Sequence, residues 1–311
     1  MSKRKTLRAL IEAPEILAMP GVFDGFSARL TEASGFAAGF VSGAGVSEAS
    51  LGWADVGILG FDENLRAARA LAGACNVPLI ADADTGYGNA VNVHFTVRGF
   101  ENAGLAGVMI EDQVWPKRCG HMKGKEVIPA DEGAAKIRAA AEARLDPDLI
   151  IMSRTDALAT HGLDEVVRRL NMYAEAGADL LFADAVLTVE HISTIVRSVP
   201  KPLCVNMGFG IRKRSTTPLL SARELEGLGV AVVIYPRLLT AASVQGMKNA
   251  IAALKEQLQA GTVTDRPDLL VSFEELNELV GIKELERLEQ HSLTSGQLRQ
   301  KYEGAASRAA E

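Results

Sequence analysis

Cysteine is scarce in this sequence of 311 residues, which contains only Cys75, Cys119 and Cys204. Their irregular spacing matches neither a disulfide framework nor a zinc-binding pattern. We therefore expect a reducing compartment, the cytoplasm. Cys75 and Cys204 stand in apolar segments, as buried structural cysteines do. Cys119 is different, because it lies between Arg118 and a Gly-His pair.

Long apolar runs and an excess of positive charge are also missing. No stretch approaches the roughly 18 apolar residues of a membrane span, and no apolar segment follows the basic N-terminus. The formal net charge is -6, so the chain has no nucleic-acid-binding footprint. We expect no membrane or nucleic-acid partner, and the 48% hydrophobic content is enough to form a large core.

Eight short apolar runs recur along the chain, each followed by a loop and a helix-like pattern. Continuous rather than alternating apolar runs favour strands buried on both faces, as in a parallel sheet. Eight such units in about 250 residues predict a closed (β/α)8 barrel, an α/β fold. A doubly wound sheet is the alternative, but no glycine-rich phosphate loop follows the first strand. The runs cover 16–22, 37–43, 77–84, 106–112, 149–157, 179–185, 202–208 and 231–236.

The intervening segments predict helices over 62–75, 92–104, 130–144 and 163–177. Further helices are expected over 244–261 and 272–291, and this tail is too long to be the eighth barrel helix alone. We treat residues 1–311 as a single barrel domain in which 245–311 form a helical C-terminal extension.

Polar residues stand at the C-terminal ends of nearly all the predicted strands. Active sites of barrels lie at that face, although strands in general end in polar loops. Three acidic strand ends in succession favour an active site. The residues are Asp24, Ser42, Gly43, Asp82, Asp84, Glu111, Asp112, Arg154, Asp156, Asp184, Asn206 and Tyr235.

Asp82 and Asp84 are two residues apart on a predicted strand, so both side chains should point to the same side. Two carboxylates so close repel each other unless a cation lies between them. Oxygen donors without His or Cys suit Mg²⁺ or Mn²⁺ better than Zn²⁺. Glu111, at the end of the neighbouring strand, could complete the set directly or through water. The alternative is a pair of carboxylates that accept hydrogen bonds from loop amides.

Cys119 shares its loop with Lys117, Arg118 and His121, and nearby positive charge stabilises a thiolate. Such a thiol can serve as a general acid or base, with His121 as its partner. A nucleophilic role would need a dedicated base and an oxyanion site. An ordinary exposed loop cysteine is the other interpretation. Arg154 can offer two parallel hydrogen bonds to a substrate carboxylate, pair with nearby acids, or both.

Four segments together resemble the isocitrate lyase/phosphoenolpyruvate mutase superfamily, especially its 2-methylisocitrate lyase-like members. They are SGAGV (42–46), ADADTGYGN (81–89), KRCGH (117–121) and SRTDA (153–157), and the resemblance runs from about residue 8 to 255. It implies a (β/α)8 barrel, usually in a homotetramer whose paired subunits exchange the eighth helix.

The resemblance also implies roles for individual residues. Asp82 and Asp84 would hold Mg²⁺, with Glu111 helping through water, and Asp55 would be an acid on the loop near the metal. Cys119, Gly120 and His121 would lie on a mobile loop that closes over the substrate. The remaining candidates for substrate binding are Ser42, Gly43, Ala44, Arg154, Asp184 and Asn206.

The implied activity is that of a Mg²⁺-dependent carbon–carbon lyase, which cleaves a 2-hydroxy di- or tricarboxylate to pyruvate and a second carboxylate. Cys119 would be the general acid, and Asp55 or Tyr87 the base. Carboxyphosphonoenolpyruvate or phosphoenolpyruvate phosphonomutase chemistry and oxaloacetate hydrolysis are the alternatives. A non-catalytic scaffold would be expected to lack Asp82, Asp84 or Cys119, and all three are present.

Two departures from the methylisocitrate lyase pattern bear on the substrate. The family has a glutamate where this chain has Asp184, and an arginine after the Tyr-Pro pair, which we align with Ala241. Both help to hold the leaving part of the substrate. Segment 206–218 is longer and more basic than usual, so Arg212, Lys213 or Arg214 could substitute. A dicarboxylate such as 2,3-dimethylmalate is therefore as plausible as a tricarboxylate.

Overall fold

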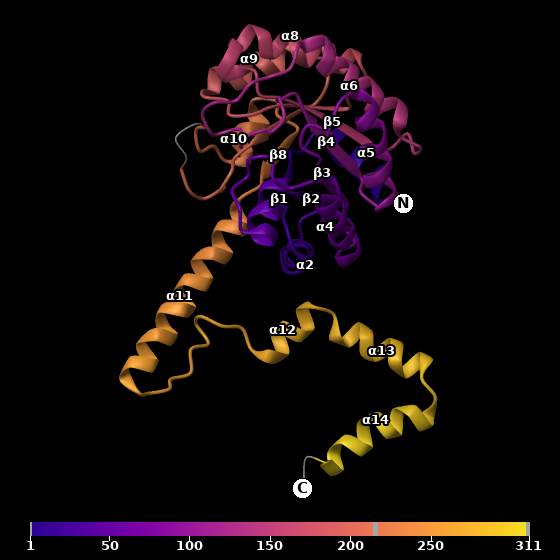
Figure 1. Ribbon diagram of the computed structural model, residues 1–311, viewed down its shortest axis with the longest axis vertical. Helices are drawn as coiled ribbons and strands as arrows, with labels where there is room; N and C mark the ends of the chain where they lie inside the picture. The colour runs from indigo at the N-terminus through magenta and orange to yellow at the C-terminus, as the bar shows by residue number, and fades with distance from the viewer. Residues whose placement is uncertain (1, 214–216, 309–311) are drawn as a thin grey trace. The chain divides into compact units, whose positions relative to one another are not determined.

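The computed structural model describes residues 2–213 and 217–308. Eight parallel strands form a closed barrel in chain order, which confirms the predicted (β/α)8 architecture (Figure 1). Each strand lies within its predicted run, and nearly every strand residue is buried, as continuous apolar runs indicate. The strands are β1 (Leu17–Val22), β2 (Gly39–Val41), β3 (Leu79–Asp82), β4 (Gly107–Glu111), β5 (Ile150–Thr155), β6 (Leu180–Ala183), β7 (Leu203–Asn206) and β8 (Val232–Tyr235).

Helices connect successive strands and form the outer layer of the barrel. The predicted helices match α4, α5, α6 and α8, with ends that differ by one or two residues. Gly104 and Gly177 follow two of these helices by two residues, and their φ angles of 92° and 110° let the chain turn toward β4 and β6. The larger helices of this layer are α2 (Gly25–Ala33), α4 (Phe61–Ala74), α5 (Ala90–Asn102), α6 (Ala130–Ala143), α8 (Leu163–Glu175), α9 (Val189–Ser198) and α10 (Ala222–Gly227).

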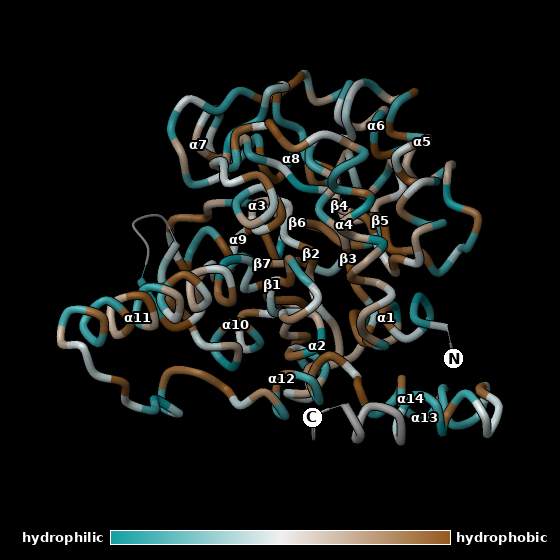
Figure 2. Tube along the Cα trace, turned by 60° about the horizontal axis from the view of Figure 1, so that its bottom comes forward, coloured by the Kyte–Doolittle hydropathy of each residue, from teal (hydrophilic) through white to brown (hydrophobic). Residues whose placement is uncertain are grey.

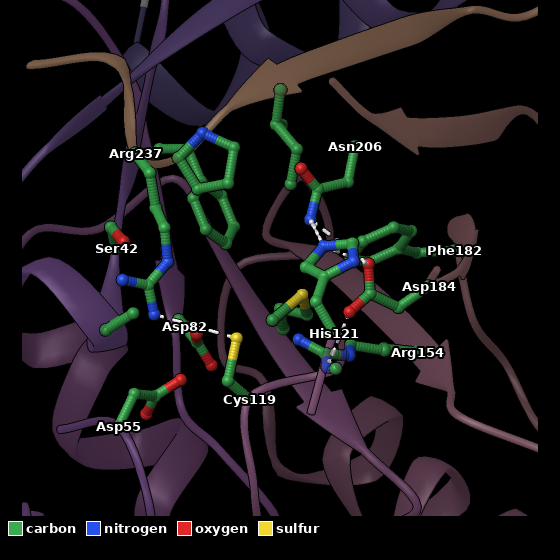
Figure 3. A pocket seen from close by; sticks show the side chains of 16 residues that line it. Ser42, Asp55, Asp82, Cys119, His121, Arg154, Phe182, Asp184, Asn206 and Arg237 are labelled. Carbon is green, nitrogen blue, oxygen red and sulfur yellow. Dashed lines mark hydrogen bonds and ion pairs between the residues drawn. The ribbon is translucent and has the colours of Figure 1, made fainter. Parts of the chain in front are cut away.

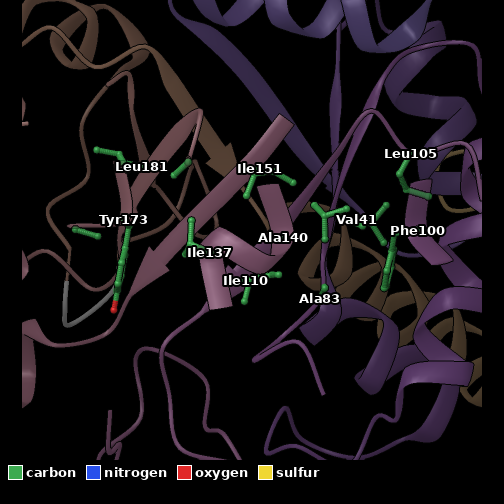
Figure 4. Close-up of a cluster of buried hydrophobic side chains, with 14 of the residues drawn as sticks. Val41, Ala83, Phe100, Leu105, Ile110, Ile137, Ala140, Ile151, Tyr173 and Leu181 are labelled. Carbon is green, nitrogen blue, oxygen red and sulfur yellow. The ribbon is translucent and has the colours of Figure 1, made fainter. Parts of the chain in front are cut away.

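The barrel has two apolar cores because its strands are buried on both faces. Inside the barrel, Met19, Phe40, Met109 and Met152 pack with their neighbours. Leu7 and Ile11 of α1 (Lys3–Glu12) belong to the same cluster. The second core lies between the strands and the helices, and Figure 4 shows part of it, including Val41, Phe100, Ile137, Ile151 and Tyr173. Rigid packing on both sides fixes the strand ends from which functional side chains project.

The chain divides into two compact units, residues 1–245 and 246–311. Helix α11 (Leu238–Ala260) begins in the first unit, and its remainder belongs to the second. The second unit also contains α12 (Phe273–Leu279), α13 (Ile282–Ser292) and α14 (Ser295–Arg308), of which α14 was not predicted. Figure 2 shows apolar residues recurring along α11. Within the described ranges, no helix is both long and apolar enough to cross a membrane.

Candidate active site

A cavity of about 40 Å³ opens at the C-terminal ends of the barrel strands (Figure 3). Most of the predicted site residues line it, although they come from segments far apart in the sequence. Gly43, Asp84 and Glu111 lie behind this lining. The lining residues are Phe40, Ser42, Ala44, Asp55, Asp82, Met109, Cys119, Gly120, His121, Arg154, Phe182, Asp184, Asn206, Ile234, Pro236 and Arg237.

Asp82 is the last residue of β3, and Asp84 lies beyond the strand with a φ of 49°. The prediction that both carboxylates stand on one strand was therefore wrong, because the chain enters a left-handed turn after Asp82. The Asp84 amide donates a hydrogen bond to Asp82 Oδ1 over 2.9 Å. Gly43 packs beside Asp82, since a Cβ at Gly43 would lie 3.0 Å from Asp82 Oδ2. A larger residue at position 43 would therefore crowd this carboxylate.

Lys117 turns inward from the loop after β4 and lies among these acids. Its Nζ atom is 2.5 Å from Asp55 Oδ1 and 2.7 Å from Asp84 Oδ1, and its side chain is almost completely buried. These carboxylates, with Glu111 and Asp82, raise the pKa of Lys117 well above its usual value although burial acts in the opposite direction. The ammonium therefore stays charged in this setting and offsets part of the local negative charge.

Carboxyl groups outnumber cationic side chains in this buried region. Burial raises the pKa of Asp82 and of Glu111, and it raises that of Asp84 to about 7 together with the charges of Asp82 and Asp55. Among the described residues, neither Oε atom of Glu111 has a hydrogen-bond donor. Among the described residues, the buried cations around these acids are Lys117, Lys125, Lys136 and Arg154, and they are outnumbered by the buried carboxyl groups of Asp55, Asp82, Asp84, Glu111, Asp156 and Asp184.

This excess of unsatisfied carboxylate oxygen fits a hard divalent cation such as Mg²⁺. In the part of the chain that the structure describes, no three His, Cys, Asp or Glu side chains enclose a single point as ligands of a bound ion would. The donor chemistry at Asp82, Asp84 and Glu111 nevertheless suits the ion.

Arg154, near the end of β5, holds a central position among the acids. Its guanidinium contacts Asp156 Oδ2 at 2.8 Å, Asp184 Oδ2 at 2.8 Å and Glu111 Oε2 at 3.2 Å, and it stacks over the Phe182 ring at 5.5 Å. Among the described residues, these ion pairs use Nε and Nη2 alone. Arg154 therefore pairs with nearby acids, as one sequence interpretation predicted. It also lines the cavity, and its binding of a substrate carboxylate stays a prediction.

Cys119 lies in the loop between β4 and α6 and points toward Arg237 (Figure 3). The distance from its Sγ to Arg237 Nη2 is 3.6 Å, and Arg237 also forms an ion pair with Glu48. We expected the cations near Cys119 to come from its own loop. Instead, Lys117 pairs with Asp55 and Asp84, while Arg118 is exposed.

Gly120 and His121 pack on the other side of the cavity, against the ends of β6 and β7. His121 Nε2 lies 3.8 Å from Asp184 Oδ1 and 3.4 Å from Asn206 Nδ2. Asn206 donates a hydrogen bond to Asp184 Oδ1 over 3.1 Å. Burial alone would raise the pKa of Asp184, but Arg154, His121 and Lys125 lower it well below its usual range. Asp184 is therefore an anion that joins this part of the loop to Arg154.

Ser42 and Ala44 reach the cavity from the turn after β2. Ser42 caps α3 (Gly43–Val46), and its hydroxyl accepts a hydrogen bond from the Gly45 amide over 3.1 Å. Asp55 lines the cavity whereas Tyr87, the other candidate base, does not. Tyr87 accepts a hydrogen bond from Asn64, and burial and nearby acids raise its pKa well above the usual value. The geometry therefore favours Asp55 of the two.

Arg237 is the functional candidate that sequence reasoning missed. We aligned the arginine after the Tyr-Pro pair with Ala241, which was wrong, because Arg237 follows Tyr235-Pro236 directly and lines the cavity. Ala241 lies within α11. Of the substitutes proposed for it, Arg212 and Lys213 are exposed and do not line the cavity, and Arg214 falls outside the described residues. The position of Arg237 just after a predicted strand end was the signal available.

Comparison with known sequences matches residues 7–255 to the family described as phosphoenolpyruvate phosphomutase. The chain belongs to this family. It is 40% identical over 297 residues to 2,3-dimethylmalate lyase of Eubacterium barkeri, a match that covers 95% of this chain and all of the relative. Other curated relatives are named 2-methylisocitrate lyase. These relatives confirm the sequence resemblance and identify the chain as an enzyme, a carbon–carbon lyase of this superfamily.

Solved structures agree with this assignment. Oxaloacetate acetylhydrolase in complex with 3,3-difluorooxalacetate superimposes with a TM-score of 0.87 at 31% identity, covering 94% of this chain and 97% of that one. Phosphonopyruvate hydrolase in complex with oxalate and Mg²⁺ has a TM-score of 0.83 at 31% identity, covering 94% of this chain and all of that one. The barrel family therefore includes several chemistries on small oxo acids.

Proposed function

We propose that this protein is a Mg²⁺-dependent lyase that cleaves a 2-hydroxy dicarboxylate of the 2,3-dimethylmalate type, or a tricarboxylate of the 2-methylisocitrate type. The products are pyruvate and a second carboxylate. The observation that carries the proposal is the contact between Cys119 and Arg237 in the wall of a cavity that is also lined by Asp55, Asp82 and Arg154. A proton donor on one side and groups that bind a hydroxy acid on the other are what the reaction requires.

The substrate would be held at two ends. Asp82, Asp84 and Glu111 would hold Mg²⁺, which when bound would supply positive charge to the substrate's hydroxyl and carboxylate groups. Arg154 presents its remaining guanidinium nitrogen, Nη1, to the same carboxylate, because its ion pairs in the described structure use Nε and Nη2. Ser42 and Ala44 border this end of the cavity, and Gly43 leaves room for Asp82.

Asp55 is the proposed base for the hydroxyl proton, since it lines the cavity next to Lys117. As the hydroxyl oxygen loses its proton, its electrons form the carbonyl of the 2-oxo acid, and the bond between C2 and C3 breaks. The electron pair of that bond moves to C3, where the adjacent carboxylate stabilises it as an enolate. Charge develops in a region that already contains fixed cations, so little reorganisation is needed.

Cys119 is the proposed general acid, which transfers its proton to C3 of the departing fragment. The thiolate that remains is stabilised by Arg237, whose Nη2 atom is 3.6 Å from the sulfur. Arg237 also supplies a positive charge for the second carboxylate of the substrate. Asp184 and Asn206, with His121, border the same side of the cavity and would orient the departing fragment.

The loop that carries Cys119 would open to admit the substrate. The cavity is narrow, with a volume of about 40 Å³, and Cys119, Gly120 and His121 of this loop form part of its wall. Closure of residues 117–125 after binding would exclude water while the enolate exists. This gives a physical reason for placing the acid on a loop.

A pyruvate-release assay tests the proposal. The purified enzyme is given 2,3-dimethylmalate, 2-methylisocitrate, isocitrate and oxaloacetate in parallel, with and without EDTA, and Cys119→Ser is measured alongside. We expect pyruvate from 2,3-dimethylmalate or 2-methylisocitrate, with release abolished by EDTA and strongly reduced in the variant. Isocitrate, whose carbinol carbon bears hydrogen in place of methyl, would give glyoxylate and no pyruvate. If no hydroxy acid yields pyruvate, the lyase proposal fails.

The second candidates are hydrolysis of oxaloacetate and phosphonate chemistry. They are favoured by the structural similarity to oxaloacetate acetylhydrolase and phosphonopyruvate hydrolase. Oxalate or acetate formed from oxaloacetate, or turnover of phosphonopyruvate or carboxyphosphonoenolpyruvate, would identify them in the same experiment. Within this proposal, the enzyme works in the cytoplasm as a homotetramer.

A further inference from the structure

A buried ion-pair network beside the cavity connects the Cys119 loop to Arg154. Asp156 is fully buried and accepts two parallel hydrogen bonds from Arg154. They run from Nε to Oδ2 over 2.8 Å and from Nη2 to Oδ1 over 3.1 Å. Lys125 Nζ reaches the same Oδ1 atom at 2.9 Å. The same ammonium donates a second hydrogen bond to the Gly120 carbonyl over 2.5 Å. One carboxylate is thus shared by a strand-end arginine and by a loop lysine.

Asp112 holds the backbone of Asp156 in place. Its Oδ1 atom accepts a hydrogen bond from the Asp156 backbone amide over 3.0 Å, and its Oδ2 atom accepts one from the Thr155 hydroxyl over 2.7 Å. Tyr173 and Arg169 complete the contacts to Oδ2 at 2.7 and 3.0 Å. Asp156 therefore has little freedom to move, and groups bound to it are positioned relative to the barrel.

Burying an ammonium group is costly unless its hydrogen bonds are made. Lys125 is only 7% exposed, although it stands in a surface loop beside the exposed Lys123 and Gly124. Its two acceptors lie on different elements, the Gly120 carbonyl in the loop and Asp156 after β5. The buried ammonium of Lys125 therefore makes both hydrogen bonds only when Gly120, the residue after Cys119, lies within its reach while it pairs with Asp156.

We propose that Lys125 is a positioning residue that couples the closed position of Cys119 to Arg154 through Asp156. The proposal rests on the proposed function for the roles of Cys119 and Arg154. Lys125 does not line the cavity, so it would act through Gly120 and Asp156. It holds the Gly120 backbone against Asp184 and Arg154, at a position where only glycine fits. The Cys119 thiol and Arg154, the proposed ligand of the substrate carboxylate, are thereby held in fixed positions relative to each other.

The experiment compares Lys125→Gln and Lys125→Arg with Lys123→Gln, a matched control at an exposed position two residues away in the same loop. The first readout is the rate at which iodoacetamide alkylates Cys119 in the resting enzyme, located by peptide mass spectrometry. Cys75 and Cys204 are buried and report on general loosening of the fold. The second readout is kcat and KM with the substrate found in the pyruvate-release assay.

We expect Lys125→Gln to raise the alkylation rate of Cys119 several-fold while Cys75 and Cys204 stay protected. We expect kcat to fall by about 10²-fold with a much smaller change in KM, because a displaced acid affects the chemical step more than binding. Lys125→Arg keeps the charge, so its alkylation rate and its kcat should both lie between those of Lys125→Gln and the wild type. Lys123→Gln should match the wild type.

Two results would overturn the proposal. In one, Lys125→Gln leaves the alkylation of Cys119 and the value of kcat unchanged. In the other, Cys75 and Cys204 become reactive together with Cys119, which would mean that the lysine stabilises the whole fold. The alkylation measurement needs no substrate. If the wild-type enzyme releases no pyruvate, the proposed function fails while the labelling result still decides the role of Lys125.

Discussion

Gly120 occupies a position with no space for a side chain. A Cβ atom there would lie 1.7 Å from Asp184 Oδ2 and 2.7 Å from Arg154 Nη2. We expect Gly120→Ala to force the loop away from Arg154 and to lower kcat by about 10²-fold. Steady-state kinetics tests this. Gly73→Ala in α4, where a Cβ meets nothing within 4 Å, is the control and should retain activity. Equal activity of the two variants would contradict the prediction.

Arg237 contacts the thiol of Cys119, with its Nη2 atom 3.6 Å from the sulfur. Replacing it with methionine removes its contacts to Cys119 and Glu48 and the charge that we assign to the second carboxylate of the substrate. We expect Arg237→Met to lower kcat/KM roughly 10–100-fold, which corresponds to the loss of a hydrogen bond to a charged group. Arg212→Met, at an exposed position of the basic segment, should leave kcat/KM unchanged. A loss of kcat/KM in Arg212→Met but not in Arg237→Met would instead identify Arg212 as the substrate-binding cation.

Residue types near the site were predictable from the sequence, but their partners were not. The sequence places Lys117 and Arg118 within two residues of Cys119, yet the first is buried between Asp55 and Asp84 and the second is exposed. Neighbouring loop residues point in different directions, and no periodicity reveals which one faces inward. Arg237 lies 118 residues from Cys119, so only the closure of the barrel brings the two together.

At the scale of elements, sequence periodicity predicted the architecture well because it follows from burial on one or both faces. The eight strands all fall within their predicted runs. The failures have local causes. Strand β3 stops at Asp82 because Asp84 takes a left-handed conformation, which alternating side-chain geometry does not foresee. Helix α14 was missed because its segment, SGQLRQKYEGAASR, lacks a clear apolar stripe.

Helix α8 illustrates how an outer helix supports the site. Arg169 contacts both Glu165 at 2.8 Å and Asp112 at 3.0 Å, and Asp112 in turn holds the Asp156 backbone. Glu165 also pairs with Arg168 at 2.7 Å. Hydrogen bonds from Arg168 and Arg169 lower the pKa of Glu165 from 4.5 to about 2. The folded state therefore favours the ionised carboxylate more strongly than the unfolded state does.

This pKa difference gives a pH-dependent contribution to stability. It is fully present above pH 4.5 and is lost as the pH falls toward 2, because only the unfolded chain takes up the proton in that interval. We expect Glu165→Gln to lower the thermal midpoint at pH 7 by roughly 2–4 °C, and the difference from the wild type to shrink at pH 3.5. Calorimetry at the two pH values measures it, with Asp164→Asn as the control. A difference that grows at pH 3.5 would refute this account.

At the scale of the whole molecule, α11 exposes an apolar stripe. Met247, Ile251, Leu254 and Leu258 follow a spacing of four, three and four residues and are 56–73% exposed. Such a stripe is typical of a helix that packs against another surface. It is consistent with the expected homotetramer, in which helices are exchanged between subunits.

Charges placed on the stripe should disrupt this assembly. We expect Ile251→Lys with Leu254→Lys to reduce the assembly to smaller species, because two buried ammonium groups would have no partners. Size-exclusion chromatography with light scattering measures the mass. The double variant Lys248→Gln and Lys255→Gln, on exposed positions of the same helix, should keep the mass of the wild type. A wild-type protein that is already monomeric would contradict the tetramer.

The closed barrel also has a consequence for the synthesis of the protein. Strand β1 pairs with β8 through Leu17 and Val232, which are separated by almost the whole first unit. At about 5–20 residues per second, a ribosome leaves the free edge of β1 without its partner for on the order of 10–40 s. An unpaired strand edge invites association with other chains. The last strand to emerge therefore ends the most aggregation-prone interval in the life of the nascent chain.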